Sequence, residues 1–250
     1  MKKWTAVLLA AILACGFAAA LAEAGSTGTS GAVPAPGDVI LFGSYEQDNQ
    51  PDNGPEPIEW TVLEVQEGKA LLLSCCGLDA VPYHEPWNED DFTWETCTLR
   101  AWLNDSFLNT AFTGEEQGKI LLTAVDNGPE QGNSQWTLDG GNDTEDRIFL
   151  LSFAEAARYL DLQYVYMHDP DEKSNAAAQA RPTAYAVARG VMVNGDYVLR
   201  SDRDMGDWWL RSPAHYPGFA SAVSVSGFLG APRASTKTVA VRPALWIGLE

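Results

Sequence analysis

The chain has 250 residues, of which 34 are acidic and 16 are basic, so its formal net charge is −18. A protein this negative is a poor partner for nucleic acid, because binding the phosphate backbone needs a positive surface. The composition therefore excludes nucleic acid and favours a solvated surface, a sugar, a peptide or a cation as the partner.

Residues 1–24 have the composition of a signal peptide. Lys2 and Lys3 precede an uncharged apolar run that ends near Ala22, and alanines at 20, 22 and 24 offer the A-x-A spacing that signal peptidase reads. The sequence predicts a secreted or cell-surface protein whose mature chain begins at Glu23 or Gly25. Its net charge after cleavage is about −19, because two lysines and one glutamate are lost.

Two alternatives for this segment stay open. An uncleaved segment would anchor the protein in a membrane, and Cys15 could be the lipidated residue of a lipoprotein. Residues 25–36 consist almost wholly of small residues and proline, which predicts a flexible linker. Residues 37–250 contain no second linker of this kind and are predicted to form a single domain.

The domain is predicted to open with three strands, at residues 38–45, 58–66 and 69–75. These runs are rich in valine, isoleucine, leucine and aromatic residues. Glu67 and Gly68 form a tight turn between the second and the third strand. The pattern indicates a β-meander.

The middle of the chain is predicted to be helical. A helix over residues 98–110 carries one apolar stripe, at Leu99, Trp102, Leu103 and Phe107. Thr113 with Glu116, and Ser152 with Glu155, match the capping box that starts a helix. A further short helix is predicted over residues 183–189.

The remaining strands complete an α+β fold with a C-terminal antiparallel sheet. We expect strands at residues 147–151, 191–194, 197–200, 207–211, 220–226, 228–231 and 238–247. Two aromatic or β-branched runs, residues 208–213 and 241–246, each contain an arginine followed closely by a proline. This shared pattern predicts that they are adjacent strands of one sheet.

Five ordered motifs resemble those of a bacterial domain of unknown function family, family 6273. They are Ile-Glu-Trp-Thr-Val-Leu at 58–63, Trp-Glu-Thr-Cys-Thr-Leu-Arg-Ala-Trp-Leu-Asn at 94–104, Phe-Leu-Leu-Ser at 149–152, Trp-Trp-Leu-Arg-Ser-Pro at 208–213 and Val-Arg-Pro-Ala-Leu at 241–245. The family name implies no activity. The layout is also distantly similar to C-type-lectin-like folds, which implies that loops around residues 201–236 form a display surface.

The cysteines leave three interpretations open. Removal of Cys15 leaves Cys75, Cys76 and Cys97, an odd number for an exported protein. They could be three reduced thiols, one disulfide from either adjacent cysteine to Cys97, or a reactive or metal-binding set. The lectin-like resemblance includes formylglycine-generating enzymes, which use paired cysteines in the C-terminal half. No cysteine follows Cys97, so the sequence argues against that activity.

Nothing in the sequence forms a recognisable catalytic set. The three histidines, His84, His168 and His215, lie in no zinc or hydrolase motif. We therefore expect an exported, non-catalytic binding or adhesion module without a cofactor, whose extracellular ligand is a glycan or a peptide. The alternative is a cell-wall or glycan-acting enzyme that uses carboxylates the sequence does not single out.

One acidic loop is a candidate cation site. It carries Asp139, Asn142, Asp143 and Glu145 around a glycine pair. Such oxygen-bearing side chains suit calcium, but the loop lacks the order and length of an EF-hand. A solvated loop without an ion is the simpler interpretation.

Aromatic residues divide into core and surface candidates. The predicted core positions are Trp60, Trp102 and Trp209. Trp208 is predicted to face outward, because successive side chains of a strand take opposite faces. The candidate ligand-binding residues are Trp208, His215, Tyr216, Phe219, Tyr83 and Trp87.

Arg211 and Arg242 close the two C-terminal runs. They could pin the last strands through buried partners, or they could grip an anionic ligand. We interpret both as structural arginines.

Overall fold

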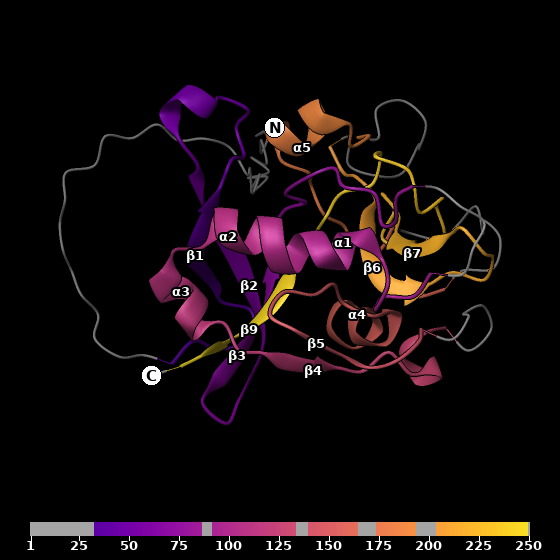
Figure 1. Ribbon diagram of the computed structural model, residues 1–250, viewed down its shortest axis with the longest axis horizontal. Coiled ribbons are helices and arrows are strands. Elements are labelled where there is room, and N and C mark those ends of the chain that lie inside the picture. Colours follow the sequence, from indigo (N-terminus) through magenta and orange to yellow (C-terminus); the bar gives the residue numbers. More distant parts are fainter. Residues whose placement is uncertain (1–32, 87–91, 134–139, 165–173, 194–203, 250) are drawn as a thin grey trace, which may run out of the picture. The chain divides into compact units, whose positions relative to one another are not determined.

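Antiparallel strands and short helices make up the computed structural model of the protein (Figure 1). The described residues are 33–86, 92–133, 140–164, 174–193 and 204–249. The chain divides into Met1–Ala32 and Val33–Glu250. The predicted signal peptide and most of the predicted linker therefore lie outside the described residues.

The predicted meander is confirmed in the first sheet. β1 (Val39–Tyr45), β2 (Glu56–Gln66) and β3 (Lys69–Ser74) pair antiparallel in that order. Glu67 and Gly68 both have positive φ, 49° and 74°. Positive φ at both central residues is what a two-residue hairpin needs to match the twist of its strands. The short helix η1 (Pro51–Asn53) lies between β1 and β2.

The final strand, β9 (Ala244–Gly248), joins this first sheet, so the predicted pairing of residues 241–246 with residues 208–213 is wrong. β9 pairs with β3, and Leu71 lies opposite Trp246. The run before β9 contacts residue 208 by a single parallel bridge at Ala240. Both runs suit a buried strand, so their composition could not decide which strand each one pairs with.

The helices begin where the sequence indicates. The helix predicted over residues 98–110 is present as α1, η2 and α2, with η2 forming a turn of π-helix. Both capping boxes are formed, at Thr113 before α3 and at Ser152 before α4. The helix bounds are α1 Thr98–Trp102, η2 Leu103–Phe107, α2 Leu108–Ala111, α3 Gly114–Lys119, α4 Phe153–Leu160 and α5 Ala184–Arg189.

Two smaller sheets complete the domain. One pairs β4 (Thr123–Val125) with β5 (Thr144–Asp146). The other has the order β6 (Trp208–Pro213), β7 (Ala220–Val223) and β8 (Leu229–Gly230). The short helix η3 (Pro129–Gln131) lies between β4 and β5.

Several predicted strands of this half differ from the structure. No strand forms over residues 147–151, where a single bridge joins Phe149 to Ala244. The strand of this region is β5, which ends at Asp146, just before the predicted one. The last predicted strand, at 238–247, is shortened to β9, because Pro243 cannot donate to a ladder. Most of the predicted strand pair at 191–200 lies outside the described residues.

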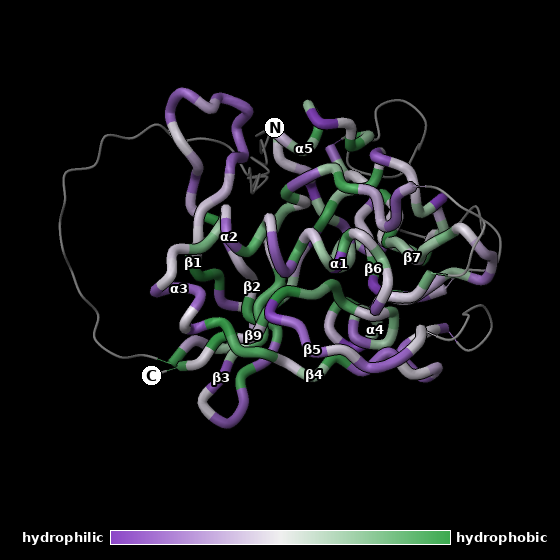
Figure 2. Tube along the Cα trace, viewed as in Figure 1, coloured by the Kyte–Doolittle hydropathy of each residue, from purple (hydrophilic) through white to green (hydrophobic). Residues whose placement is uncertain are grey.

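The core gathers hydrophobic stretches of β2, β3 and β9 (Figure 2). Trp60, Trp94, Trp208 and Trp209 are fully buried. Trp102 is only partly buried and packs against the edge of this core. Large rings contribute most of the burial per side chain, so these tryptophans dominate the packing.

Gly43 tests how tightly β1 packs on the helices. Its φ is +69°, and a Cβ there would lie 2.5 Å from the Phe112 ring. Gly43→Ala should cost roughly 2 to 4 kcal/mol of unfolding free energy, because backbone strain and overpacking add. Gly37→Ala is the control, since Gly37 has a φ of +94° and nothing within 4 Å. Urea unfolding that found equal losses for both variants would contradict the packing argument.

Candidate functional site

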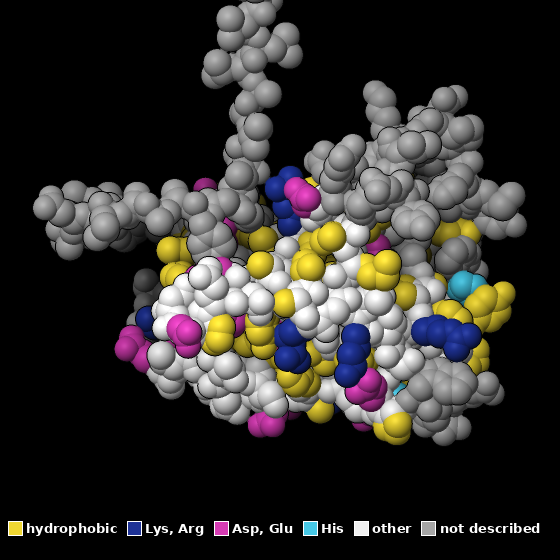
Figure 3. All heavy atoms as spheres, turned by 90° about the horizontal axis from the view of Figure 1, so that it is seen from above, with side chains coloured by type: hydrophobic (Ala, Val, Ile, Leu, Met, Phe, Trp, Pro, Cys, Tyr) yellow, Lys and Arg dark blue, Asp and Glu magenta, His cyan; other side chains and the backbone are white. Residues whose placement is uncertain are grey.

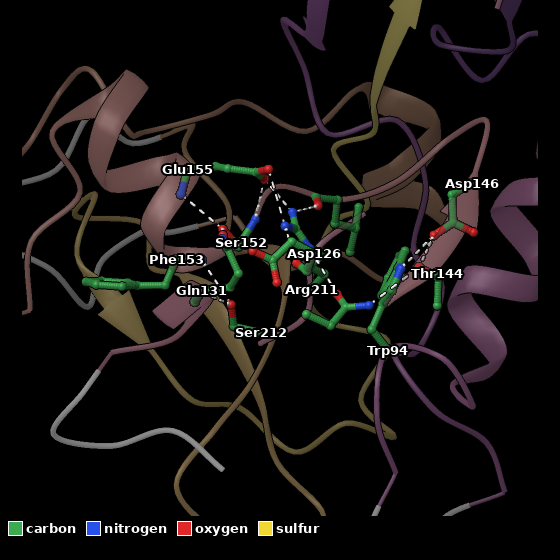
Figure 4. A network of polar contacts seen from close by, with 12 residues as sticks. Trp94, Asp126, Gln131, Thr144, Asp146, Ser152, Phe153, Glu155, Arg211 and Ser212 are labelled. Carbon is green, nitrogen blue, oxygen red and sulfur yellow. Dashed lines mark hydrogen bonds and ion pairs between the residues drawn. The ribbon is translucent and has the colours of Figure 1, made fainter. Parts of the chain in front are cut away.

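Arg211 of β6 lies at the centre of a buried polar network (Figure 4). Its guanidinium donates to the carboxylate of Glu155 through both terminal nitrogens. It also donates to the side-chain oxygen of Asn127 at 3.2 Å and to the backbone oxygens of Leu150 at 3.0 Å and Asp126 at 2.9 Å. These five hydrogen bonds use every donor of the guanidinium. This geometry favours the structural interpretation of Arg211.

The same network fixes the start of α4. Glu155 accepts from the backbone N–H of Ser152 at 2.9 Å, so one carboxylate serves both the helix cap and Arg211. Ser212 donates to the backbone oxygen of Gln131 at 2.9 Å and accepts from the N–H of Phe153 at 3.0 Å. The cavity beside Arg211 has a volume of about 10 Å³. It has room for about one water molecule and is too small for a sugar ring.

Two predicted ligand-binding residues are buried, which corrects those predictions. Trp208 is fully buried because both faces of β6 are covered, so the alternation argument does not apply, and its ring N–H donates to Ala178 at 2.9 Å. Tyr83 is also fully buried and donates to the backbone oxygen of Arg211 at 2.6 Å. Burial raises the pKa of the Tyr83 phenol well above its usual range. Trp87 lies outside the described residues.

The other predicted ligand-binding residues come together on one loop. We call His215, Tyr216, Phe219 and Arg233 the ring cluster. The ring centres of His215 and Tyr216 are 3.9 Å apart, and those of Tyr216 and Phe219 are 6.3 Å apart. The Arg233 guanidinium carbon lies 5.8 Å from the centre of the Phe219 ring. Tyr216 is 59% exposed, so its ring is available to a ligand.

Backbone hydrogen bonds hold this loop in shape. The N–H of Phe219 donates to Tyr216 at 3.2 Å, and the N–H of Ala234 donates to Gly218 at 3.0 Å. Gly218 has a φ of +79°, which a glycine adopts without steric cost. Figure 3 shows hydrophobic, basic and histidine side chains together at one edge of the face seen from above. The sequence identified three members of the cluster and missed Arg233, which the chain reaches only after β8.

Two exposed side chains of the acidic loop form hydrogen bonds with neighbouring residues. Asp143 accepts from the backbone N–H of Asn127 at 3.0 Å, and the Asn142 side chain donates to Glu95 at 2.9 Å. Glu145 is exposed, and Asp139 lies outside the described residues. Neighbouring residues therefore engage two of the loop's side chains, which favours the interpretation without an ion.

A different acidic group was missed at the sequence level. The carboxylate oxygens of Glu46, Asp48 and Glu56 all lie within 4.8 Å of one another, a spacing that could hold a metal ion. The backbone N–H groups of Gln50 and Gln47 already donate to these carboxylates. Glu56 is distant in the sequence from the other two, so only the turn between β1 and β2 reveals the group.

The cysteines form no disulfide with one another among the described residues. Cys97 is the N-cap of α1 and accepts from the N–H of Arg100 at 3.4 Å. Burial raises the pKa of the Cys97 thiol to about 12, so this thiol stays protonated at neutral pH. Cys75 and Cys76 are partly exposed.

The chain belongs to a family described as domain of unknown function (DUF6273), whose model matches residues 67–249. The predicted family resemblance is confirmed, although the match begins after β2. No curated protein and no solved structure matches the chain. Within the described ranges, no helix is long and apolar enough to cross a membrane.

Removal of Arg211 tests its structural role. Arg211→Ala should lower the free energy of unfolding by roughly 2 to 4 kcal/mol, because Glu155 and three backbone or amide oxygens lose a donor. Arg158→Ala is the matched control on α4, because Arg158 is 65% exposed in its pair with Glu64. Such surface pairs contribute about 0 to 1 kcal/mol. If urea unfolding found Arg211→Ala as stable as the control, Arg211 would belong to a binding site.

Proposed function

We propose that the protein is an exported, non-catalytic binding or adhesion module, and that its ring cluster binds a glycan or a peptide. The observation that carries this proposal is the ring cluster itself. It places three rings of the β6–β7 loop beside the guanidinium of Arg233, which follows β8, and Tyr216 is largely exposed. Aromatic residues and arginine are the side chains most often found at the energetic centres of interfaces.

The chemistry of the cluster suits both ligand classes. An aromatic ring offers a flat apolar face to a sugar ring or a peptide side chain, and it loses little conformational entropy on binding. The guanidinium of Arg233 adds donors for hydroxyl, carbonyl or carboxylate oxygens. The small cavity beside Arg211 favours a surface binder over an enzyme with an enclosed pocket.

The lectin-like similarity remains part of this proposal. An α+β domain with short helices and a loop-rich segment between β6 and β9 supports it. In such a fold the loops around residues 201–236 form the display surface, and the ring cluster lies within that stretch.

Binding arrays of glycans and peptides test the proposal. Tyr216→Ala and Phe219→Ala should each weaken a retained ligand at least about tenfold, which corresponds to about 1.4 kcal/mol for one central ring. Leu122→Ala is the control, since Leu122 is 57% exposed but lies in the segment before β4. If the variants kept full affinity, or if no ligand on either array bound, the proposal would fail.

The mature N-terminus tests export. The lysine pair, the apolar run and the A-x-A spacing predict cleavage before Glu23 or Gly25. Intact-mass measurement of material secreted by a bacterial host should therefore find one of these two ends. A chain that begins at Met1, or one that begins at a lipidated Cys15, would contradict this prediction.

A further inference from the structure

The segment that follows β3 bulges opposite Arg242. Backbone hydrogen bonds lie on either side of the bulge, from the N–H of Ser74 to Pro243 at 3.0 Å and from the N–H of Leu78 to Val241 at 2.8 Å. Between these two bonds, the segment after β3 has three residues, Cys75, Cys76 and Gly77. The opposite segment has only one, Arg242. Bulges of this kind redirect side chains and are frequent beside functional sites. Here the bulge places two adjacent cysteines opposite one arginine.

The guanidinium of Arg242 is buried with an unused donor. Arg242 is 6% exposed, its Nε donates to the backbone oxygen of Ser74 at 2.8 Å, and its Nη1 has no hydrogen-bond partner. Its Cζ lies 4.8 Å from the centre of the Trp208 ring. Within the described ranges, no carboxylate pairs with it. A buried cation of this kind is costly unless an anion lies close by.

Among the described residues, Cys75 and Cys76 are the ionisable side chains whose charges act on Arg242. On β2, Glu59 is the charged residue opposite Cys75, and its backbone oxygen accepts from the N–H of Cys75 at 2.9 Å. Burial lowers the pKa of the Arg242 guanidinium to about 10. The negative charges of the two cysteines oppose this shift, and Cys75 contributes more than Cys76. This interaction is reciprocal, so the guanidinium favours the thiolate over the thiol. The hydroxyl of Thr61 lies 3.3 Å from the sulfur of Cys75 and can donate to a thiolate there. Partial exposure leaves Cys75 open to a small reagent.

We propose that Cys75 is a nucleophilic thiol whose thiolate is stabilised by Arg242. Cys75 then forms mixed disulfides with low-molecular-mass disulfides. The thiolate sulfur of Cys75 attacks one sulfur of the small disulfide, and a new sulfur–sulfur bond forms as the old one breaks. The leaving group departs as a thiolate and takes a proton from water. Cys75 is oxidised and half of the small disulfide is reduced. This reactive site is separate from the ring cluster and does not depend on its ligand.

The pH dependence of alkylation tests the thiolate. The full chain is treated with iodoacetamide over a pH series, and labelling of each cysteine is followed by peptide mass spectrometry. The inflection for Cys75 should lie at least about one pH unit below that of the same residue in urea, where an unperturbed cysteine titrates near 8.5. At pH 7 such a shift raises the thiolate fraction roughly eightfold. An inflection equal to or above the value in urea would overturn the proposal.

Variants separate the contributions of the neighbours. Thr61→Val keeps the shape of the side chain and removes the donor, so it should move the Cys75 inflection toward the value in urea. Arg242→Gln removes the positive charge and should move the inflection further toward the value in urea. If the Arg242 variant does not fold, the Thr61 variant still tests the proposal. Cys97 is the internal control, since burial keeps it unlabelled in the folded chain. A low inflection at Cys76 in place of Cys75 would overturn the assignment.

Oxidised glutathione tests the covalent step. The folded chain should gain one glutathionyl group, at Cys75, and a reductant should remove it. Cys75→Ser should gain none, while Cys97→Ser should react as the parent does. If the parent gained no adduct, or gained it only at another cysteine, the mixed-disulfide proposal would be refuted.

Discussion

The ion pair between the buried Arg211 and the partly exposed Glu155 is the constraint on which the packing of β6 against α4 depends. The arginine comes from β6 and the glutamate from the first turn of α4, and the same guanidinium holds the backbone of Asp126 and Leu150. A charged group can be buried in this way only when its donors are satisfied, and here every one of them is. Because Glu155 also caps α4, the start of the helix and the position of the strand are fixed by one carboxylate.

Arg242 is also a buried arginine, but one of its donors lacks a hydrogen-bond partner. Both arginines are buried and both sit within two residues of a proline, yet only Arg211 has a carboxylate and a complete set of acceptors. The difference lies in the neighbouring segments, since α4 supplies an acid to one and the bulge after β3 supplies two thiols to the other. A buried cation without a carboxylate partner destabilises the folded state. Such groups are often found at functional sites, so the surroundings of Arg242 are a candidate reactive site.

The proposed binding surface and the proposed thiol site place different demands on the protein. The ring cluster needs only a rigid loop and exposure, and the glycine turn at Gly218 together with the bridge from Phe219 to Arg233 provides the rigidity. The thiol site needs burial of the cation and partial access to the sulfur, which only the edge of a core can combine. The acidic surface charge is compatible with both, because it acts on solubility and does not select a fold.

The sequence by itself determined the local structures that depend only on residues close together in the chain. The capping boxes at Thr113 and Ser152 and the turn at Glu67 were predictable, because each satisfies its own backbone geometry. The motifs likewise identified the family, and four of the five, all except that at 58–63, lie within the matched residues 67–249. The tertiary structure decided which strand β9 joins and that Trp208 is buried. It also brought a cation opposite Cys75. These outcomes depend on partners far away along the chain, and alternation carries no information where both faces of a strand are covered.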